Sequence, residues 1–340
     1  MSPYSGCDFF SFFGVFFPRM WQLLFGKIGF SELASDEIQV IVLICSGISA
    51  ALVGCFLVLK KMTMLANALS HTVLLGIVTS FLVLSCFSQH KVFGMSLSVL
   101  LLGSILAAFL TTTLVELCKK LFSLDEGSSI GLIFSFLFAI GIALVTVFAK
   151  GVHLGTEAIM GNIDALHVHD IKLVMYTLLA SVFVITVFFK YFQILCFDGS
   201  FAKSIGLHPG FFHYLLMLLT ASASICCFRA IGVFLFLIFL TAPAMSARLF
   251  TKKLRSLLIL SCVFSIFGSL LSIAVSRHVF TYYDIPLSTA GLSCVILSIM
   301  YPVALLVVKM QRNLLKSKVK YKSDSSSKFK KKTSLVDTTG

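Results

Sequence analysis

One histidine lies inside a long apolar stretch. Residues 65–87 read LANALSHTVLLGIVTSFLVLSCF, in which His71 is the only acidic or basic side chain and Asn67 comes four residues earlier. At that spacing the two side chains share one helix face. A titratable group at membrane depth is costly unless it faces a bundle interior or a wet cavity, so His71 is a candidate for a substrate or ion pathway. The alternative is that His71 hydrogen-bonds a neighbouring helix and stabilises packing. Both interpretations stay open on these residues alone.

A second candidate is the polar stretch FDGSFAKSIGLHPG, residues 197–210. It carries a short helical pattern over 200–205 and then Gly206 and Pro209, where a helix is expected to end. A compact helix between two membrane spans would suit docking into a partner protein. An ordinary connector with turn residues explains the same pattern, since functional loops are common but connectors are commoner.

The densest group of possible metal ligands lies in the stretch KGVHLGTEAIMGNIDALHVHDIK, residues 150–172. This stretch would receive metal at the outer face of a transporter, or it would be a solvated loop with ordinary polar residues. His167 and His169 are two residues apart and would not share a helix face, which favours the solvated loop. The candidate ligands for metal entry are His153, Glu157, His167, His169 and Asp170.

Composition indicates an all-α, polytopic membrane helix bundle. The 340 residues are 58% hydrophobic and 12% charged, with 35 phenylalanines and a mean hydropathy of +1.02. Apolar runs near the length of about 20 residues that a spanning helix needs predict nine spans, or eight if the short run 230–247 with Pro243 is broken or re-entrant. The nine runs are 38–59, 65–87, 94–115, 129–149, 173–189, 211–228, 230–247, 256–276 and 287–308.

The positions of basic residues predict the orientation. If the nine spans are laid end to end, one side of the membrane receives 20 of the 27 lysine and arginine residues, so that side is expected to be the cytoplasm. The N-terminus then lies outside. The segments assigned to the cytoplasm are 60–64, 116–128, 190–210, 248–255 and 309–340.

Three regions follow along the chain. Residues 1–37 form an external segment, whose apolar stretch 9–25 contains Pro18, Arg19 and the only tryptophan and is interpreted as an interfacial helix rather than a further span. Residues 38–308 form the transmembrane domain. Residues 309–340, with ten basic and two acidic residues and a serine run, are expected to be a disordered tail attracted to anionic headgroups.

Several function classes find no support in the sequence. The ten cysteines include no C-x-x-C pair and are interpreted as small core residues. There is no zinc-protease, serine-hydrolase, dinucleotide-binding or phosphate-loop motif, and no nucleic-acid module. We therefore expect no enzyme activity from this chain and no permanently bound cofactor, and any ATP hydrolysis must come from another chain. Small residues spaced at four, Gly47, Ala51 and Cys55, and the pair Gly127 and Gly131, predict close helix packing.

Five stretches together resemble the permease subunit of bacterial ATP-binding-cassette importers for manganese, zinc or iron. They occur in that family's order and approximate spacing, and the resemblance extends from about residue 38 to residue 308. The stretches are KKMTMLANALSHTVLLG (60–76), GLIFSFLFAIG (131–141), IMGN (159–162), DGSFAKSIG (198–206) and the run 233–247 ending in TAPAMSA.

This resemblance implies partners and residue roles. It implies a dimer of identical or related permeases in the bacterial cytoplasmic membrane, two cytosolic ATPase subunits and an external metal-binding protein. Residues 198–206 would be the loop that couples to the ATPase, with Asp198, Phe201, Ala202 and Gly206 as its motif residues. His71 would meet the transported divalent metal. The family usually has an aspartate where this chain has Asn67, whose amide oxygen can coordinate a metal but brings no negative charge.

A secondary cation transporter without an ATPase partner is the alternative function. It would require an ion-coupling site, yet no predicted span has an aspartate or glutamate at its centre, and the loop motif would have no role. A structural membrane protein would leave both His71 and the loop unexplained.

Overall fold

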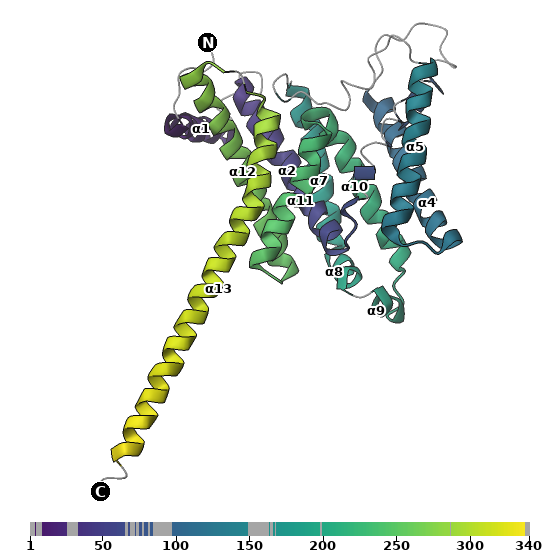
Figure 1. Ribbon diagram of the computed structural model, residues 1–340. Coiled ribbons are helices and arrows are strands. Elements are labelled where there is room, and N and C mark those ends of the chain that lie inside the picture. The colour runs from purple at the N-terminus through teal and green to yellow at the C-terminus, as the bar shows by residue number, and fades with distance from the viewer. Residues whose placement is uncertain are drawn as a thin grey trace.

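In the computed structural model the chain is a bundle of long helices (Figure 1). The structure describes residues 4, 9–25, 33–64, 67, 68, 72, 75, 76, 78–80, 82, 83, 97–148, 163, 166, 168–197, 199–285 and 287–336. Within these ranges no strand occurs, which confirms the all-α class. The helices are α1 (Phe9–Leu24), α2 (Ser35–Leu59), α4 (Leu97–Phe122), α5 (Glu126–Phe148), α7 (Val168–Val187), α8 (Phe189–Phe197), α9 (Gly199–Ser204), α10 (Pro209–Ile231), α11 (Val233–Phe250), α12 (Leu254–Tyr283) and α13 (Thr289–Val336).

Seven helices among the described residues are long and apolar enough to cross a membrane. They correspond to seven of the nine predicted spans. Residues 97–115 of the predicted span 94–115 lie within α4, an apolar helix of 26 residues. Residues 94–96 and much of the predicted span 65–87 lie outside the described residues. The chain is therefore a multi-pass membrane protein.

Helix α2 forms the centre of the bundle. It packs against α7, α10, α11 and α12, and most of its residues are buried. Small residues allow this packing, because a side chain at Gly47 would clash with Ser265 and Phe239, and one at Gly54 would overlap the backbone of Leu240. The close packing predicted at Gly47 is thus confirmed.

The close packing predicted for Gly127 and Gly131 is not found among the described residues. A Cβ added at Gly131 would meet no atom within 4 Å, and one at Gly127 would meet only Asp125. Both glycines are on α5, most of whose spanning residues are not buried by the described residues. Small residues spaced four positions apart therefore do not by themselves identify a contact between helices.

Two prolines and one glycine shape the second half of the bundle. Pro209 begins α10 at a position where its missing N–H needs no partner. Gly232, at φ +82°, separates α10 from α11. Pro243 lies inside α11, which nevertheless continues to Phe250. The predicted run 230–247 therefore begins at the end of α10, and its part from Val233 onward is one unbroken helix.

The C-terminal segment differs from the expectation. Residues 309–336, predicted to be disordered, continue α13 as a helix that extends far beyond the bundle (Figure 1). Lysine is a good helix former, and a helix that already exists as a membrane span needs no new nucleation to continue. Charge density alone was therefore a poor guide to disorder here.

The ends of the helices divide the bundle into two sides. Figure 1 shows α8, α9, the turn between α11 and α12 and the C-terminus of α13 at one end, which we call the α9 end. Helix α1 packs against α12 at the opposite end, the α1 end. Three of the five segments that charge assigned to one side, namely 190–210, 248–255 and the described part of 309–340, thus lie toward one end of the molecule.

Candidate functional site

A short helical segment, α8 followed by α9, lies at the α9 end of the bundle. Helix α9 ends in a Schellman motif, in which the N–H of Leu207 donates to the carbonyl of Ala202 (3.1 Å) and the N–H of Gly206 donates to the carbonyl of Lys203 (3.0 Å). Gly206 has φ +81°, a left-handed conformation that side-chain-bearing residues rarely adopt. The predicted stop of the helix at Gly206 is confirmed.

Helix α9 has one buried and one exposed face. Ala202 is buried, whereas Phe201 and Ile205 are 55% and 52% exposed. Because these two residues are four apart, they lie on the same face. Large apolar side chains that share an exposed face beyond the membrane spans are typical of a protein contact.

An apolar hollow of about 600 Å³ lies directly after α9. Phe211 on its lining is 60% exposed, so the hollow extends the apolar surface of α9. It is lined by Gly206, Leu207, His208, Pro209, Gly210, Phe211 and Phe212.

The candidate pathway residues are only partly within the described structure. Asn67 is helical and half-buried, while His71 lies outside the described residues. Further along the same stretch, Thr79 and Ser80 line a mainly apolar cavity of about 410 Å³ against α4. Within the described ranges, no three histidine, cysteine, aspartate or glutamate side chains are grouped so that they could hold a metal ion.

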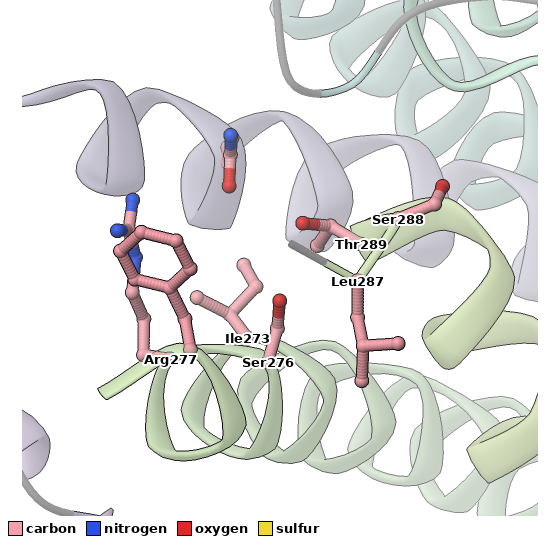
Figure 2. A pocket seen from close by; sticks show the side chains of 8 residues that line it. Ile273, Ser276, Arg277, Leu287, Ser288 and Thr289 are labelled. Atoms are coloured by element: carbon pink, nitrogen blue, oxygen red, sulfur yellow. The ribbon is translucent and has the colours of Figure 1, made fainter. Parts of the chain in front are cut away.

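A second cavity, of about 380 Å³, lies at the α1 end between α2, α12 and the start of α13 (Figure 2). Figure 2 shows Ile273 and Ser276 on α12 facing α2, with Ser288 and Thr289 at one side. Arg277 on this lining forms an ion pair with the buried Asp36 of α2. The second carboxylate oxygen of Asp36 has no hydrogen-bond partner. The full lining is Gln39, Ile273, Ser276, Arg277, Phe280, Leu287, Ser288 and Thr289.

Comparison with known proteins shows which family has this architecture. Residues 37–309 match the model of the ABC 3 transport family. The chain belongs to this family. The matched range contains Asn67, His71, the α8–α9 segment and both cavities, and it begins after α1, which is therefore outside the part that the family model covers.

Individual relatives of the ABC 3 transport family agree. The chain is 40% identical over 301 residues to a Chlamydia pneumoniae protein named "Probable metal transport system membrane protein", covering 88% of this chain and 90% of that protein. It is 35% identical over 230 residues to the manganese transport system membrane protein MntD of Bacillus subtilis, covering 64% of this chain and 75% of MntD. The solved structure of PsaBC from Streptococcus pneumoniae in complex with Fab matches with a TM-score of 0.68 at 26% identity, over 85% of this chain and 97% of that one. The predicted resemblance is thereby confirmed.

The ligand-rich stretch of this family member is described only in part. His153, Glu157 and His167 lie outside the described residues, as does Asp198 in the coupling motif, and His169 is described only as part of helix α7. Asp170 forms an ion pair with Arg229 of α10 at 3.8 Å. This contact gives Asp170 a structural partner in the first turn of α7.

Sequence reasoning missed two pairs that involve charged residues at the ends of spans. One is the ion pair of Asp36 with Arg277. The other is a hydrogen bond rather than an ion pair, in which the Lys60 ammonium donates to Nδ1 of His213 at 3.1 Å. A usable signal was present, because each of these residues stands at the edge of an apolar run, where it remains near water until a neighbouring helix supplies a partner.

Proposed function

We propose that this chain is the membrane-spanning permease of an ATP-binding-cassette importer for a divalent metal ion, either manganese, zinc or iron. The metal is the transported substrate and not a resident cofactor. The α9 end faces the cytoplasm, and the membrane is the bacterial cytoplasmic membrane. A second permease copy, a cytosolic ATPase and an external metal-binding protein complete the importer.

The exposed apolar face of α9 is the observation that carries the proposal. Phe201 and Ile205 are presented by a helix whose orientation is fixed by buried Ala202 on one face and by the Schellman motif at its end. A secondary transporter has no use for a rigid apolar contact outside the membrane, whereas a permease without its own nucleotide site requires one. The names of the relatives support a metal as the substrate.

The path of the metal is proposed to include Asn67 and His71. Metal delivered by the external protein enters between two permease copies, and ATP binding in the cytosolic subunits moves α8 and α9. The permease supplies ligands and a changing access route and performs no bond chemistry. Hard oxygen ligands suit manganese, and the amide oxygen of Asn67 is such a ligand but carries no negative charge. Asn67 is therefore proposed to change the affinity or selectivity for the metal relative to an aspartate at this position.

Reconstituted vesicles test the proposal directly. The chain, its ATPase and its binding protein are incorporated, and uptake of manganese, zinc and iron is measured with and without ATP. ATP-dependent accumulation is expected and would identify the metal. Uptake that ignores ATP and follows an ion gradient would instead support a secondary transporter.

Variants on α9 test the docking surface separately. Phe201→Ala should weaken binding of the ATPase with little effect on folding, because the side chain is 55% exposed. Ala202→Asp places a carboxylate at a buried site and should uncouple ATP hydrolysis from uptake. The matched control is Phe183→Ala on α7, where the ring is 68% exposed within a membrane span. Equal ATPase binding by all three variants would contradict a role for α9.

A further inference from the structure

Helix α1 has two apolar faces. Phe12 and Phe16 on one face are buried, at 0% and 4% exposure. The other face carries four exposed aromatic side chains, Phe10 (84%), Phe17 (58%), Trp21 (64%) and Phe25 (65%). A helix on a protein surface normally presents polar residues to water, so the second apolar face of α1 requires a partner.

The exposed face carries no charge. The exposed positions of α1 and the turn after it are occupied by phenylalanine, serine, glycine, proline, tryptophan and glutamine. The only charged residue of the helix, Arg19, points to the bundle, where its Nε donates to Glu37 of α2 at 2.5 Å. A docking face for a soluble protein usually has a polar rim, whereas the only polar side chains exposed on α1 are the uncharged Ser11 and Gln22.

A buried carboxylate holds α1 in this orientation. Glu37 accepts hydrogen bonds from Arg19, from the hydroxyl of Tyr4 (2.8 Å) and from the backbone N–H of Ala34 (2.9 Å). Burial, and next the hydrogen bond to Glu37, raise the pKa of Tyr4, so its hydroxyl stays protonated and remains a donor. Because Tyr4 and Arg19 both donate to one side chain of α2, α1 cannot turn its aromatic face inward without breaking these two contacts, whereas the Ala34 contact lies within the start of α2 itself.

The surface beside α1 faces the membrane. Helix α1 packs against α12, a helix of 30 residues that is apolar enough to cross the membrane and exposes Val263 and Phe267 along its length. α12 ends in Tyr282 and Tyr283, which are 62% and 70% exposed. Tyrosine and tryptophan concentrate where a membrane meets water, so the aromatic face of α1 continues an existing lipid-facing surface at its boundary.

We propose that α1 is an interfacial membrane helix. Its face of Phe10, Phe17, Trp21 and Phe25 lies in the boundary between headgroups and acyl chains, while Arg19 and Tyr4 attach the helix to Glu37 of α2. Such a helix sits about 5–10 Å into that boundary. The occupant of the face is lipid, not a second permease copy or the external binding protein. This inference does not depend on the proposed metal or the ATPase.

The native chain contains its own reporter, since Trp21 is its only tryptophan. The purified protein is placed in phosphatidylcholine bicelles, which contain no scaffold protein and whose lipid carries a nitroxide quencher either next to the headgroup or at the end of an acyl chain. Quenching by aqueous iodide is measured in parallel. The expected result is loss of Trp21 emission mainly with the headgroup-proximal nitroxide, with weak loss from iodide.

Two reference variants calibrate depth, both made in a Trp21→Phe background. Phe267→Trp places the reporter on the exposed side of α12 in mid-span, where the acyl-chain nitroxide should quench it most. Phe201→Trp places it on exposed α9, where iodide should quench it most. The native reporter should fall between these two.

The outcomes separate the possible occupants, because no other protein is present. Strong iodide quenching of Trp21 without lipid quenching would show the face in water and would overturn the proposal in favour of a protein partner. Emission insensitive to all three quenchers would show contact with a second copy of the chain and would also overturn it. Quenching of Trp21 mainly by the headgroup-proximal nitroxide is the only result that supports an interfacial position of α1.

Discussion

A single substitution at Gly206 can test whether the backbone conformation at the end of α9 is needed for ATP-driven uptake. Gly206→Ala forces a side chain into φ +81°, although no atom stands within 4 Å of the new Cβ. The left-handed conformation should cost about 1–2 kcal/mol, which weakens the hydrogen bond from Leu207 to Ala202. We expect faster hydrogen exchange at the Leu207 amide and lower ATP-driven uptake.

Gly210→Ala is the matched control. Gly210 also has no atom within 4 Å of an added Cβ, but it lies in the first turn of α10 without a positive φ. Uptake by this variant should stay normal. If Gly206→Ala behaved in the same way, the backbone conformation at the end of α9 would have no part in coupling.

The residues of the proposed metal path make a second test. His71→Ala should reduce uptake without preventing assembly of the importer, because it removes an imidazole ligand. Asn67→Asp adds a negative charge one turn away, and oxygen ligands suit manganese, so its apparent affinity for manganese should rise. Uptake across a metal concentration series measures both effects. Normal uptake by His71→Ala would remove that residue from the path.

The ion pair of Arg19 with Glu37 should contribute more to the free energy of unfolding than an exposed ion pair does. Arg19→Ala leaves Glu37, 2% exposed, without its cation, and breaking a buried pair from one side costs about 3–5 kcal/mol. Because Tyr4 and Ala34 still donate to Glu37, we expect the lower end of that range. Thermal unfolding in detergent measures the loss.

An exposed pair serves as the comparison for Arg19. Lys120 lies 3.9 Å from Glu116 on α4 and its side chain is 73% exposed. Lys120→Ala should lower the free energy of unfolding by less than about 1 kcal/mol. Similar losses for the two variants would mean that the Glu37 contacts contribute little.

At the scale of helices, the contact between α2 and α11 depends on Gly54. Gly54→Ala should lower stability by at least about 1–3 kcal/mol, because the added Cβ would overlap the carbonyl of Leu240 and the two helices must separate. Gly131→Ala on α5 meets nothing within 4 Å and should instead be neutral or stabilising by about 0.5–1 kcal/mol. The unfolding temperature should therefore fall for Gly54→Ala and should not fall for Gly131→Ala.

The elements were more predictable than their contacts. Apolar length is a property of consecutive residues, so spans such as 38–59 and 287–308 correspond closely to α2 and the apolar part of α13. Pro243 was a poor guide because, inside a bundle, neighbouring helices and side chains can satisfy a freed backbone carbonyl. Likewise Gly47 and Gly131 have equivalent sequence spacing, and only the neighbouring helix distinguishes them.

The candidate sites show the same difference between local features, which the sequence predicts, and contacts between distant residues, which it does not. The stop of α9 at Gly206 is local chemistry and was predictable, as was the helical face shared by Phe201 and Ile205. The pairing of Asp36 with Arg277 joins residues 241 positions apart. Such a pairing depends on how α2 and α12 pack, which no local pattern specifies.

At the scale of the whole molecule, α13 carries much of the net charge of +13 away from the bundle. Each lysine or arginine near an anionic membrane contributes about 1 kcal/mol of attraction. Trypsin should therefore cleave the segment 314–336 more slowly in phosphatidylglycerol nanodiscs than in phosphatidylcholine nanodiscs. Salt should remove the difference, since the screening length falls to about 3 Å at 1 M. Equal rates in both lipids at low salt would show that the segment stays in water.

The two adjacent carboxylates at the start of α2 acquire their partners at very different times during synthesis. Arg19 precedes Glu37 by 18 residues, so this pair can form as soon as α2 has been made. Arg277 follows Asp36 by 241 residues, which at a translation rate of about 5–20 residues per second corresponds to a delay of roughly 12–50 s. Until α12 arrives, water must hydrate Asp36, and this requirement keeps the start of α2 at the membrane surface while the remaining spans are inserted.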